Sequence, residues 1–256
     1  MYKAKKKYGQ NFLIDNTIIN KIINSVSINN NEKIIEIGPG KGYLTKELLK
    51  FNVDLYCFEI DTDMNSYLNK YENDNTHIIY DDFLNIDLNE YFNNNDIIHV
   101  IANIPYYITT PIIEHIIKSK LNIVDMTLMV QKEVAERLCS KPGNSEYGYI
   151  TAYLNYYYDL EKLMDVSKKC FDPIPKVDSA VIKLKSNKKT CNNEELLFKL
   201  LKDAFKMKRK NLRNNLKEYD LNKILEVLYK YNLDLSNRAE DLSIDIFIDI
   251  VNNYCK

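Results

Sequence analysis

The chain of 256 residues has no tryptophan, six glycines, six prolines and no long run of apolar residues. So little glycine and proline excludes a collagen-like or low-complexity chain. A membrane-spanning helix needs roughly 18 consecutive apolar residues, whereas the strongest apolar segment, 97–104, is short and includes His99 and Asn103. No apolar segment follows the lysines at the start, so the sequence does not predict a secretory signal. We expect a cytoplasmic protein that does not contact membranes.

Cysteine pairs and net charge are also lacking. The five cysteines are an odd number, lie far apart and include no C-x-x-C pair, which predicts free thiols in a reducing compartment and no metal site. Lys and Arg total 35 against 36 Asp and Glu, a net charge of -1. Any contact with nucleic acid must therefore depend on positive charge that is concentrated locally.

The spacing of apolar residues predicts an α/β fold. A first helix is expected over 18–26, with Asn16 or Thr17 as its N-cap. Apolar segments of strand length then alternate with helical ones, which is typical of a parallel sheet covered on both faces. We expect strands at 33–37, 54–60, 76–80, 97–102 and 123–130, and helices beginning near residue 43 and at 61–71, 111–119 and 131–140.

The end of the sheet and the C-terminal part of the chain follow different patterns. Two further strands, 160–166 and 178–184, predict a hairpin-like finish, and the tyrosine run 156–158 is expected to serve sheet and core packing. The polar stretch 186–193 has the composition of a linker. Only helical patterns follow it, at 196–205, 222–231 and 244–254. We therefore predict an α/β domain over residues 1–187 and a small helical domain over 188–256.

The first strand of the sheet ends in a glycine-rich turn, 38–42 (GPGKG). In a strand–turn–helix unit, glycines and backbone N–H groups let a cofactor approach closely. A dinucleotide fingerprint needs a third glycine at position 43, where this chain has Tyr43. The turn therefore fits a nucleoside without phosphates, such as S-adenosylmethionine, better than a dinucleotide. By itself it is also compatible with an ordinary strand-to-helix connection.

Acidic residues follow the next two strands. Glu59 ends the second strand, where a carboxylate can accept both hydroxyls of a ribose. Asp82, just past the third strand, can accept a hydrogen bond from an adenine amino group, and its neighbour Asp81 fits the same spacing. The alternative for each is a solvated acid at a strand end.

The tetrapeptide 103–106 (NIPY) follows the fourth strand, at the edge of the sheet where ligands bind. The exocyclic amine of adenine is a poor nucleophile because its lone pair is delocalised into the ring. The Asn103 side-chain carbonyl and a backbone carbonyl of the turn fixed by Pro105 can each accept one N–H, while Tyr106 can stack on the base. A methyl sulfonium is already cationic, so positioning and electrostatics supply the catalysis. Alone, this segment is slightly better explained as a proline loop with an amide cap, whereas its combination with the glycine turn and Glu59 in this order favours the functional interpretation.

Basic residues concentrate at 3–7 and at 199–217. Such runs suit phosphate contacts, although a solvated helix face is the usual explanation of a single run. Two runs beside a base-handling motif favour RNA. The candidate RNA-binding residues are Lys206, Lys208, Arg209, Lys210 and Arg213.

In their order along the chain, these segments resemble the small-subunit rRNA adenine dimethyltransferase family almost from end to end. The resemblance implies a Rossmann-like, S-adenosylmethionine-dependent methyltransferase sheet with a small C-terminal helical domain. It also implies the substrate, two adjacent adenosines in a hairpin loop near the 3′ end of small-subunit rRNA in a pre-ribosomal subunit, each converted to N6,N6-dimethyladenosine. The segments that carry it are 10–13 (QNFL), 36–45 (EIGPGKGYLT), 103–106, 129–135 (MVQKEVA), 147–148, 171–181 (FDPIPKVDSAV), 208–216 (KRKNLRNNL) and 238–240.

Residue roles follow from the matching positions. The resemblance implies that Asn103 and Pro105 hold the target amine and that Tyr106 and Phe171 sandwich the flipped base. Segment 167–170 departs from the family pattern, in which a proline often precedes this Phe. The residues implied to contact the cofactor are Asn11, Leu13, Gly38, Gly40, Glu59, Asp82 and Asn103.

Two alternatives remain open at this point. One is an Erm-type methyltransferase, which modifies an adenine of large-subunit rRNA and confers antibiotic resistance. The other is an RNA- or DNA-binding relative in which methyl transfer is secondary or lost. The GPG turn, the QKEV segment at 131–134 and the Arg-containing segment at 208–216 favour the small-subunit group. We expect the protein to act as a monomer.

Overall fold

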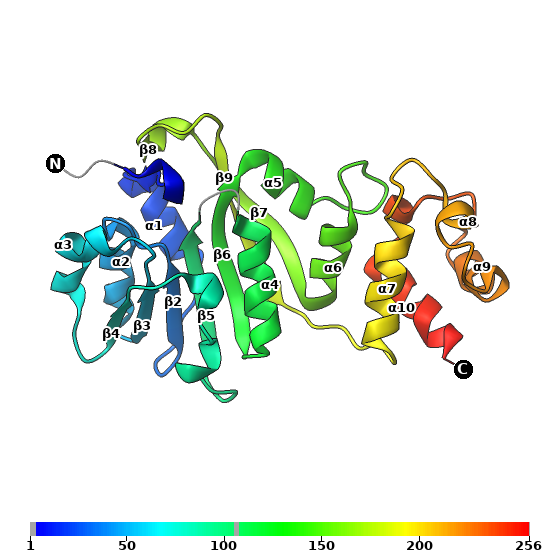
Figure 1. Ribbon diagram of the computed structural model, residues 1–256, viewed down its shortest axis with the longest axis horizontal. Coiled ribbons are helices and arrows are strands. Elements are labelled where there is room, and N and C mark those ends of the chain that lie inside the picture. Colours follow the sequence, from blue (N-terminus) through cyan, green and yellow to red (C-terminus); the bar gives the residue numbers. More distant parts are fainter. Residues whose placement is uncertain (1–3, 105–107, 256) are drawn as a thin grey trace. The chain divides into compact units, whose positions relative to one another are not determined.

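The computed structural model describes residues 4–104 and 108–255 and forms two compact units (Figure 1). The first comprises Met1–Ala135 and Glu161–Lys185, and the second comprises Glu136–Leu160 and Ser186–Lys256. The chain crosses from the first unit to the second for the last time between residues 185 and 186. This point lies close to the domain boundary that the sequence predicts at 187. The second unit also takes in 136–160, which the sequence patterns place in the α/β domain. A functional division into 1–187 and 188–256 stays a prediction.

A seven-stranded sheet forms the centre of the first unit, in the order β4-β3-β2-β5-β6-β9-β7. All pairs from β4 to β6 are parallel, and β9 runs antiparallel to β6. The expected α/β sheet is therefore confirmed. Its strands are β2 (Lys33–Ile37), β3 (Asp54–Phe58), β4 (Thr76–Ile79), β5 (Ile98–Asn103), β6 (Ile123–Gln131), β7 (Tyr158–Val166) and β9 (Ser179–Ser186).

The order of the strands reverses between β2 and β5. From β2 the chain adds β3 and then β4 on one side, and it returns to place β5 on the other side of β2. Connections that leave β2 and β5 therefore diverge to opposite faces of the sheet. A crevice forms at the carboxyl ends of such a strand pair, and ligands bind there in open α/β sheets.

Helices cover both faces of the sheet. Ile34 and Cys57 share an apolar cluster with α1 and α2. Phe58 follows Cys57 and so points to the other face, where its ring centroid lies 5.4 Å from that of Phe83. Phe83 in turn contacts the ring of His115 on α4. The helices of this unit are α1 (Asn16–Asn24), α2 (Tyr43–Leu48), α3 (Asn65–Leu68) and α4 (Thr109–Ser119), and α5 (Lys132–Leu138) begins in it and ends in the second unit.

Two local expectations were wrong. Asp15, and neither Asn16 nor Thr17, is the N-cap of α1, because its carboxylate accepts hydrogen bonds from the backbone N–H of Thr17 at 2.8 Å and of Ile18 at 3.3 Å. Such a cap stabilises a helix by about 1 kcal/mol. The helix expected over 61–71 is divided into the short α3 and the 3-10 turns Thr62–Met64 and Asn69–Tyr71.

A two-stranded sheet that the sequence did not predict joins β1 (Phe12–Leu13) to β8 (Phe171–Asp172). The two strands are antiparallel, with Leu13 opposite Phe171. This pairing fastens the segment before α1 to the connection between β7 and β9. Strands of two residues are too short to show an apolar period.

The second unit is helical and has its own apolar cluster, in which Ala152 and Tyr156 pack with Leu201, Leu228 and Phe247. This packing explains why 136–160 joins the unit. The tyrosine run divides: 156 and 157 end α6, and only 158 begins a strand. No helix in the described part of the chain is long and apolar enough to cross a membrane. The helices are α6 (Tyr149–Tyr157), α7 (Glu194–Ala204), α8 (Leu212–Asn215), α9 (Leu221–Lys230) and α10 (Ile244–Tyr254).

Candidate functional site

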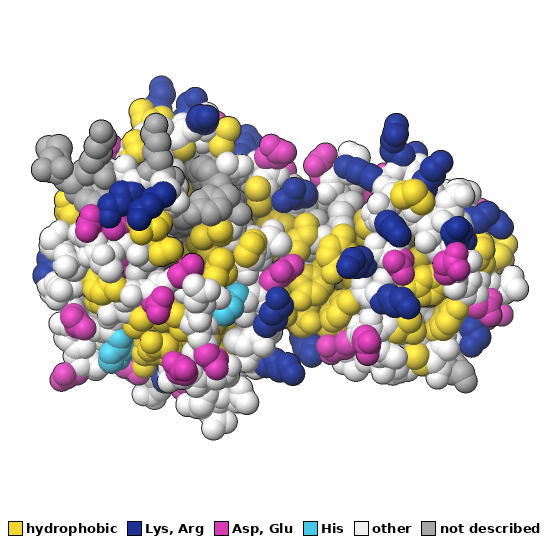
Figure 2. All heavy atoms as spheres, in the orientation of Figure 1, with side chains coloured by type: hydrophobic (Ala, Val, Ile, Leu, Met, Phe, Trp, Pro, Cys, Tyr) yellow, Lys and Arg dark blue, Asp and Glu magenta, His cyan; other side chains and the backbone are white. Residues whose placement is uncertain are grey.

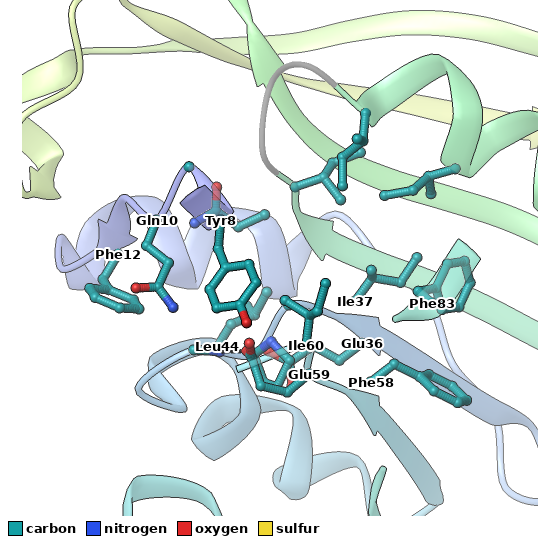
Figure 3. Close-up of a pocket in the computed structure, with 18 of the residues that line it drawn as sticks. Tyr8, Gln10, Phe12, Glu36, Ile37, Leu44, Phe58, Glu59, Ile60 and Phe83 are labelled. Carbon is teal, nitrogen blue, oxygen red and sulfur yellow. Dashed lines mark hydrogen bonds between the residues drawn. The ribbon is translucent and has the colours of Figure 1, made fainter. Parts of the chain in front are cut away.

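A cavity opens at the carboxyl ends of β2, β3 and β5, where the strand order reverses (Figure 3). It contains about 1130 Å³ of empty space, with the solvent at its open mouth included. The residues implied to contact the cofactor meet here, although the contact itself stays a prediction. All of them line the cavity: Asn11, Leu13, Gly38, Gly40, Glu59, Asp82 and Asn103.

Glu59 follows β3 and is only 4% exposed. One of its carboxylate oxygens accepts a hydrogen bond from the Gly40 backbone N–H at 2.9 Å, and the other accepts one from the Asp61 N–H at 2.9 Å. Burial raises the pKa of Glu59, and these two bonds offset the effect in part. Each carboxylate oxygen has two lone pairs, so both oxygens retain the capacity to accept a hydroxyl from a ligand.

A second buried acid, Glu36 on β2, also lines the cavity and is 1% exposed. The Cys57 thiol donates a hydrogen bond to it at 3.4 Å. Burial raises the pKa of Glu36 to about 7, and the charge of Glu59 contributes in the same direction. Two neighbouring buried carboxylates disfavour each other's ionisation. A cationic ligand in this cavity would therefore bind favourably, because it would balance the negative charge of the Glu36 and Glu59 carboxylates.

Asp81 and Asp82 both line the cavity beyond β4. The Asp82 carboxylate accepts a hydrogen bond from the Leu84 N–H at 3.1 Å, and that of Asp81 accepts one from the Asp82 N–H at 2.7 Å. Each therefore keeps acceptor capacity toward the cavity, and the selection of Asp82 stays a prediction.

The absence of a side chain at Gly40 makes room for the ring of Phe12. The φ of Gly40 is +57°, and a Cβ at this position would lie 2.8 Å from carbons of the Phe12 ring. The Lys41 ammonium lies 4.7 Å from the centroid of the same ring. The turn thus packs against the segment that contains β1, and a larger residue at position 40 would displace that segment.

Asn103 ends β5 on the opposite side of β2 from Glu59. Its side-chain Nδ2 donates a hydrogen bond to the backbone carbonyl of Asn11 at 3.1 Å. This bond orients the amide and leaves its Oδ1 as an acceptor. An acceptor at a strand end beside the cavity is what a target amine would need.

Three other residues have predicted catalytic roles, and the structure describes one of them. Pro105 and Tyr106 lie outside the described residues. Phe171 is 2% exposed and packs in the apolar cluster with Leu13 and Ile19, and it is not among the residues that line the cavity. Stacking on a base would require its ring to leave this cluster. That role stays a prediction without geometric support.

Several residues around Glu59 were missed. Figure 3 shows Tyr8 and Gln10 reaching from the segment before α1, with Tyr8 pointing toward Glu59. Ile60 is 41% exposed although it is large and apolar, and it lines the cavity, so it offers a surface that a purine ring can cover. Gln10 belongs to the QNFL segment, one of those that carry the family resemblance, so the sequence could have indicated it as a site residue. For Ile60 the only indication in the sequence is its position directly after Glu59.

The basic candidates lie in the second unit, on α8 and in the connection from α7. Figure 2 shows Lys and Arg side chains on this unit. The sequence neighbour Asp203 accepts a hydrogen bond from the Tyr219 hydroxyl at 2.7 Å. RNA binding by this cluster stays a prediction. The five residues Lys206, Lys208, Arg209, Lys210 and Arg213 are all exposed.

Within the described ranges, no group of His, Cys, Asp and Glu is arranged to hold a metal ion.

Comparison with known protein sequences gives matches over the whole chain. The model of the ribosomal RNA adenine dimethylase family matches residues 1–256. The ribosomal RNA small subunit methyltransferase A of Fusobacterium nucleatum is 44% identical over 259 residues, which cover 98% of this chain and 97% of that protein. The protein of the same name from Clostridium botulinum strain Kyoto is 41% identical, with coverage of 96% and 92%.

Solved structures give a consistent result. A dimethyladenosine transferase from Plasmodium falciparum has a TM-score of 0.79 at 26% identity and covers 95% of this chain and 97% of its own. The 23S rRNA methyltransferase ErmE has a TM-score of 0.76 at 21% identity, with coverage of 96% and 100%. At that identity the likeness shows a shared fold alone. The small-subunit names occur at 44% and 41% identity, so the Erm alternative is not favoured.

Proposed function

The chain belongs to the ribosomal RNA adenine dimethylase family, and we propose that its cavity binds S-adenosylmethionine for N6,N6-dimethylation of two adjacent adenosines in small-subunit rRNA. The target adenosines are those of a hairpin loop near the 3′ end. The observation that carries the proposal is the meeting of Glu59 and Asn103 at one cavity. They follow β3 and end β5, the two strands that flank β2.

The residues that line the cavity fit this cofactor. S-adenosylmethionine, when bound, supplies a methyl group on a cationic sulfur. Glu59 would accept the ribose hydroxyls, Ile60 would pack against the adenine, and Asp82 would accept from its amino group. The carboxylates of Glu36 and Glu59 would balance the positive charge, which explains why two acids share a buried site.

Asn103 holds the substrate amine in this proposal. Its Nδ2 is engaged by the Asn11 carbonyl, so Oδ1 accepts an N–H of the adenine amine and keeps the nitrogen lone pair out of conjugation with the ring. The proton can leave after transfer, because the electrophile is cationic and no strong base is needed. The rate gain then comes from positioning and preorganised electrostatics. Pro105 and Tyr106 keep the roles that the family resemblance implies.

The exposed basic cluster of the second unit is proposed to bind RNA phosphates. Lys and Arg contacts to phosphate position a nucleic acid without reading its bases. We propose a pre-ribosomal small subunit in the cytoplasm as the setting and a monomer as the active form.

Transfer of labelled methyl groups to unmethylated small and large subunits tests the proposal. Label is expected in the small subunit only, with two methyl groups on each of two adjacent adenosines. Methylation of large-subunit rRNA alone would replace the proposal by the Erm-type activity. Binding of the small subunit without transfer would replace it by a non-catalytic RNA-binding role.

A further inference from the structure

The segment before α1, residues 4–13, is fastened to the sheet on both sides of the cavity. On the β5 side, Asn103 Nδ2 donates to the Asn11 carbonyl at 3.1 Å. On the β3 side, Gln10 Nε2 donates to Asp61 Oδ2 at 2.8 Å. Residues 8–13 line the cavity between these two points. Figure 3 shows Gln10 and Tyr8 beside each other on this segment. The segment therefore forms a wall of the cavity.

Asp61 holds the β3 side of this wall. Its carboxylate is 1% exposed and accepts the Lys5 ammonium at 2.6 Å on Oδ1, in addition to Gln10 on Oδ2. The Gln10 Oε1 accepts the Lys5 backbone N–H at 2.7 Å, so the segment orients its own amide donor. A buried carboxylate is unfavourable unless it is paired and hydrogen-bonded. The segment and Asp61 therefore stabilise each other.

The same residue also reaches the cofactor side of the site. The Asp61 backbone N–H donates to Glu59 Oε1 at 2.9 Å. Asp61 thus connects Glu59, the acid proposed to bind the cofactor, with residues 4–13, the segment that forms the cavity wall. Loosening the carboxylate contacts would open the cavity wall without removing any group that touches the substrate amine.

We propose that Asp61 is a positioning residue for the cofactor: through Gln10 and Lys5 it holds residues 4–13 closed over the cavity and so slows cofactor release. The inference rests on the proposed function, because it takes S-adenosylmethionine as the ligand. Its consequence is kinetic. Loss of the contact should raise the dissociation rate of the cofactor and its KM, while the KM for RNA and the kcat at saturating cofactor change little.

The test compares the full-length variants Gln10→Ala and Asp61→Asn with a matched control, Asp63→Asn. Asp63 pairs with the same Lys5 at 2.6 Å, but its side chain is 60% exposed, and exposed pairs contribute little. Stopped-flow dissociation and calorimetry of S-adenosylmethionine should show about ten- to hundredfold faster release for the first two variants, the factor expected for one hydrogen bond to a charged group. The control should release the cofactor at the wild-type rate. Gln10→Glu should be more severe than Gln10→Ala, because it sets a second carboxylate against Asp61.

The outcomes separate the two proposals. Wild-type release rates in folded Gln10→Ala and Asp61→Asn proteins would overturn this inference and leave the proposed function intact. A lower unfolding midpoint with an unchanged release rate would also overturn it, since the contacts would then serve stability alone. If Asp61→Asn does not fold, Gln10→Ala decides, because it removes the donor and leaves the buried acid paired with Lys5. A wild-type protein that does not bind the cofactor would overturn both proposals.

Discussion

Asn103→Ala is expected to lower methyl transfer by about a hundred- to thousandfold while the protein stays folded. The variant removes the Oδ1 acceptor, so the target amine can rotate and its lone pair returns to conjugation with the ring. Loss of one preorganised contact of this kind costs on the order of 2.7–4 kcal/mol of transition-state stabilisation, which gives that factor in rate. It also removes the Nδ2 donor to the Asn11 carbonyl, which adds a loss of cofactor affinity.

The variant Asn103→Asp distinguishes the role of the Oδ1 acceptor from that of the Nδ2 donor. One carboxylate oxygen replaces Oδ1 as an acceptor for the target amine. The other oxygen faces the Asn11 carbonyl, which receives a donor at 3.1 Å in the wild type, and two acceptors repel at that distance. Leaving such a group unpaired costs about 1–3 kcal/mol. The variant should therefore transfer methyl groups faster than Asn103→Ala at saturating cofactor and yet bind the cofactor less tightly than the wild type.

Single-turnover methyl transfer on small subunits, at saturating cofactor, measures the chemical step for each variant. Thermal unfolding of the same samples controls for stability. An Asn103→Ala protein that transfers methyl groups at the wild-type rate would refute the assignment. Reduced stability with normal activity per folded molecule would mean that Asn103 serves only to hold the connection after β5.

Three further results are expected. Glu59→Ala should weaken S-adenosylmethionine binding by about 1–3 kcal/mol in calorimetry, and an unchanged affinity in a folded variant would remove Glu59 from the site. Replacing Arg209 and Arg213 by Ala should flatten the salt dependence of subunit binding by about one unit of slope per lost contact at constant cofactor affinity; a wild-type slope would mean that these residues only face solvent. Burial lowers the pKa of His99, but its contacts with Asp125 at 2.8 Å and with Glu32 at 3.0 Å together outweigh burial, so the pKa is raised. These contacts should therefore stabilise the fold fully below about pH 6.5 and progressively less as the pH rises through the raised value. Chemical denaturation of the wild type and His99→Asn across that range checks the sign, and equal pH dependence of the two would contradict it.

The sheet was predictable because its signal is local. Each buried strand is a short apolar segment, and the predicted strands agree with β2, β4 and β6 to within one residue at each end. Helix α6 was missed because it is rich in tyrosine, which favours strands. Its apolar face is buried by packing against α7 and α10, which lie far along the chain. The β1–β8 pair depends on a contact between segments far apart in the chain.

The site divides in the same way. Glu59 and Asn103 could be placed because parallel strands bring their carboxyl ends to one edge of a sheet. The contact of Gln10 with Asp61 could not, since a hydrogen bond between distant polar residues leaves no periodic pattern. The family resemblance assigns base stacking to position 171, which stays a prediction. The burial of Phe171 in an apolar cluster could not be predicted, because it depends on packing that no sequence segment contains by itself.

The glycine-rich turn was located correctly and explained incompletely. The sequence suggests the approach of a cofactor as the reason for its glycines. At Gly38, however, the φ of +70° by itself would strain any other residue, although the nearest atom to an added Cβ, the Asn103 carbonyl oxygen, lies at an ordinary contact distance of 3.8 Å. At Gly40 the obstacle is the Phe12 ring at 2.8 Å, and the positive φ would strain any other residue as well. A substitution at Gly40 would therefore act on the cavity by displacing the segment that forms its wall. The turn and the QNFL segment at 10–13 depend on this contact, so the two motifs of the sequence are parts of one packed site.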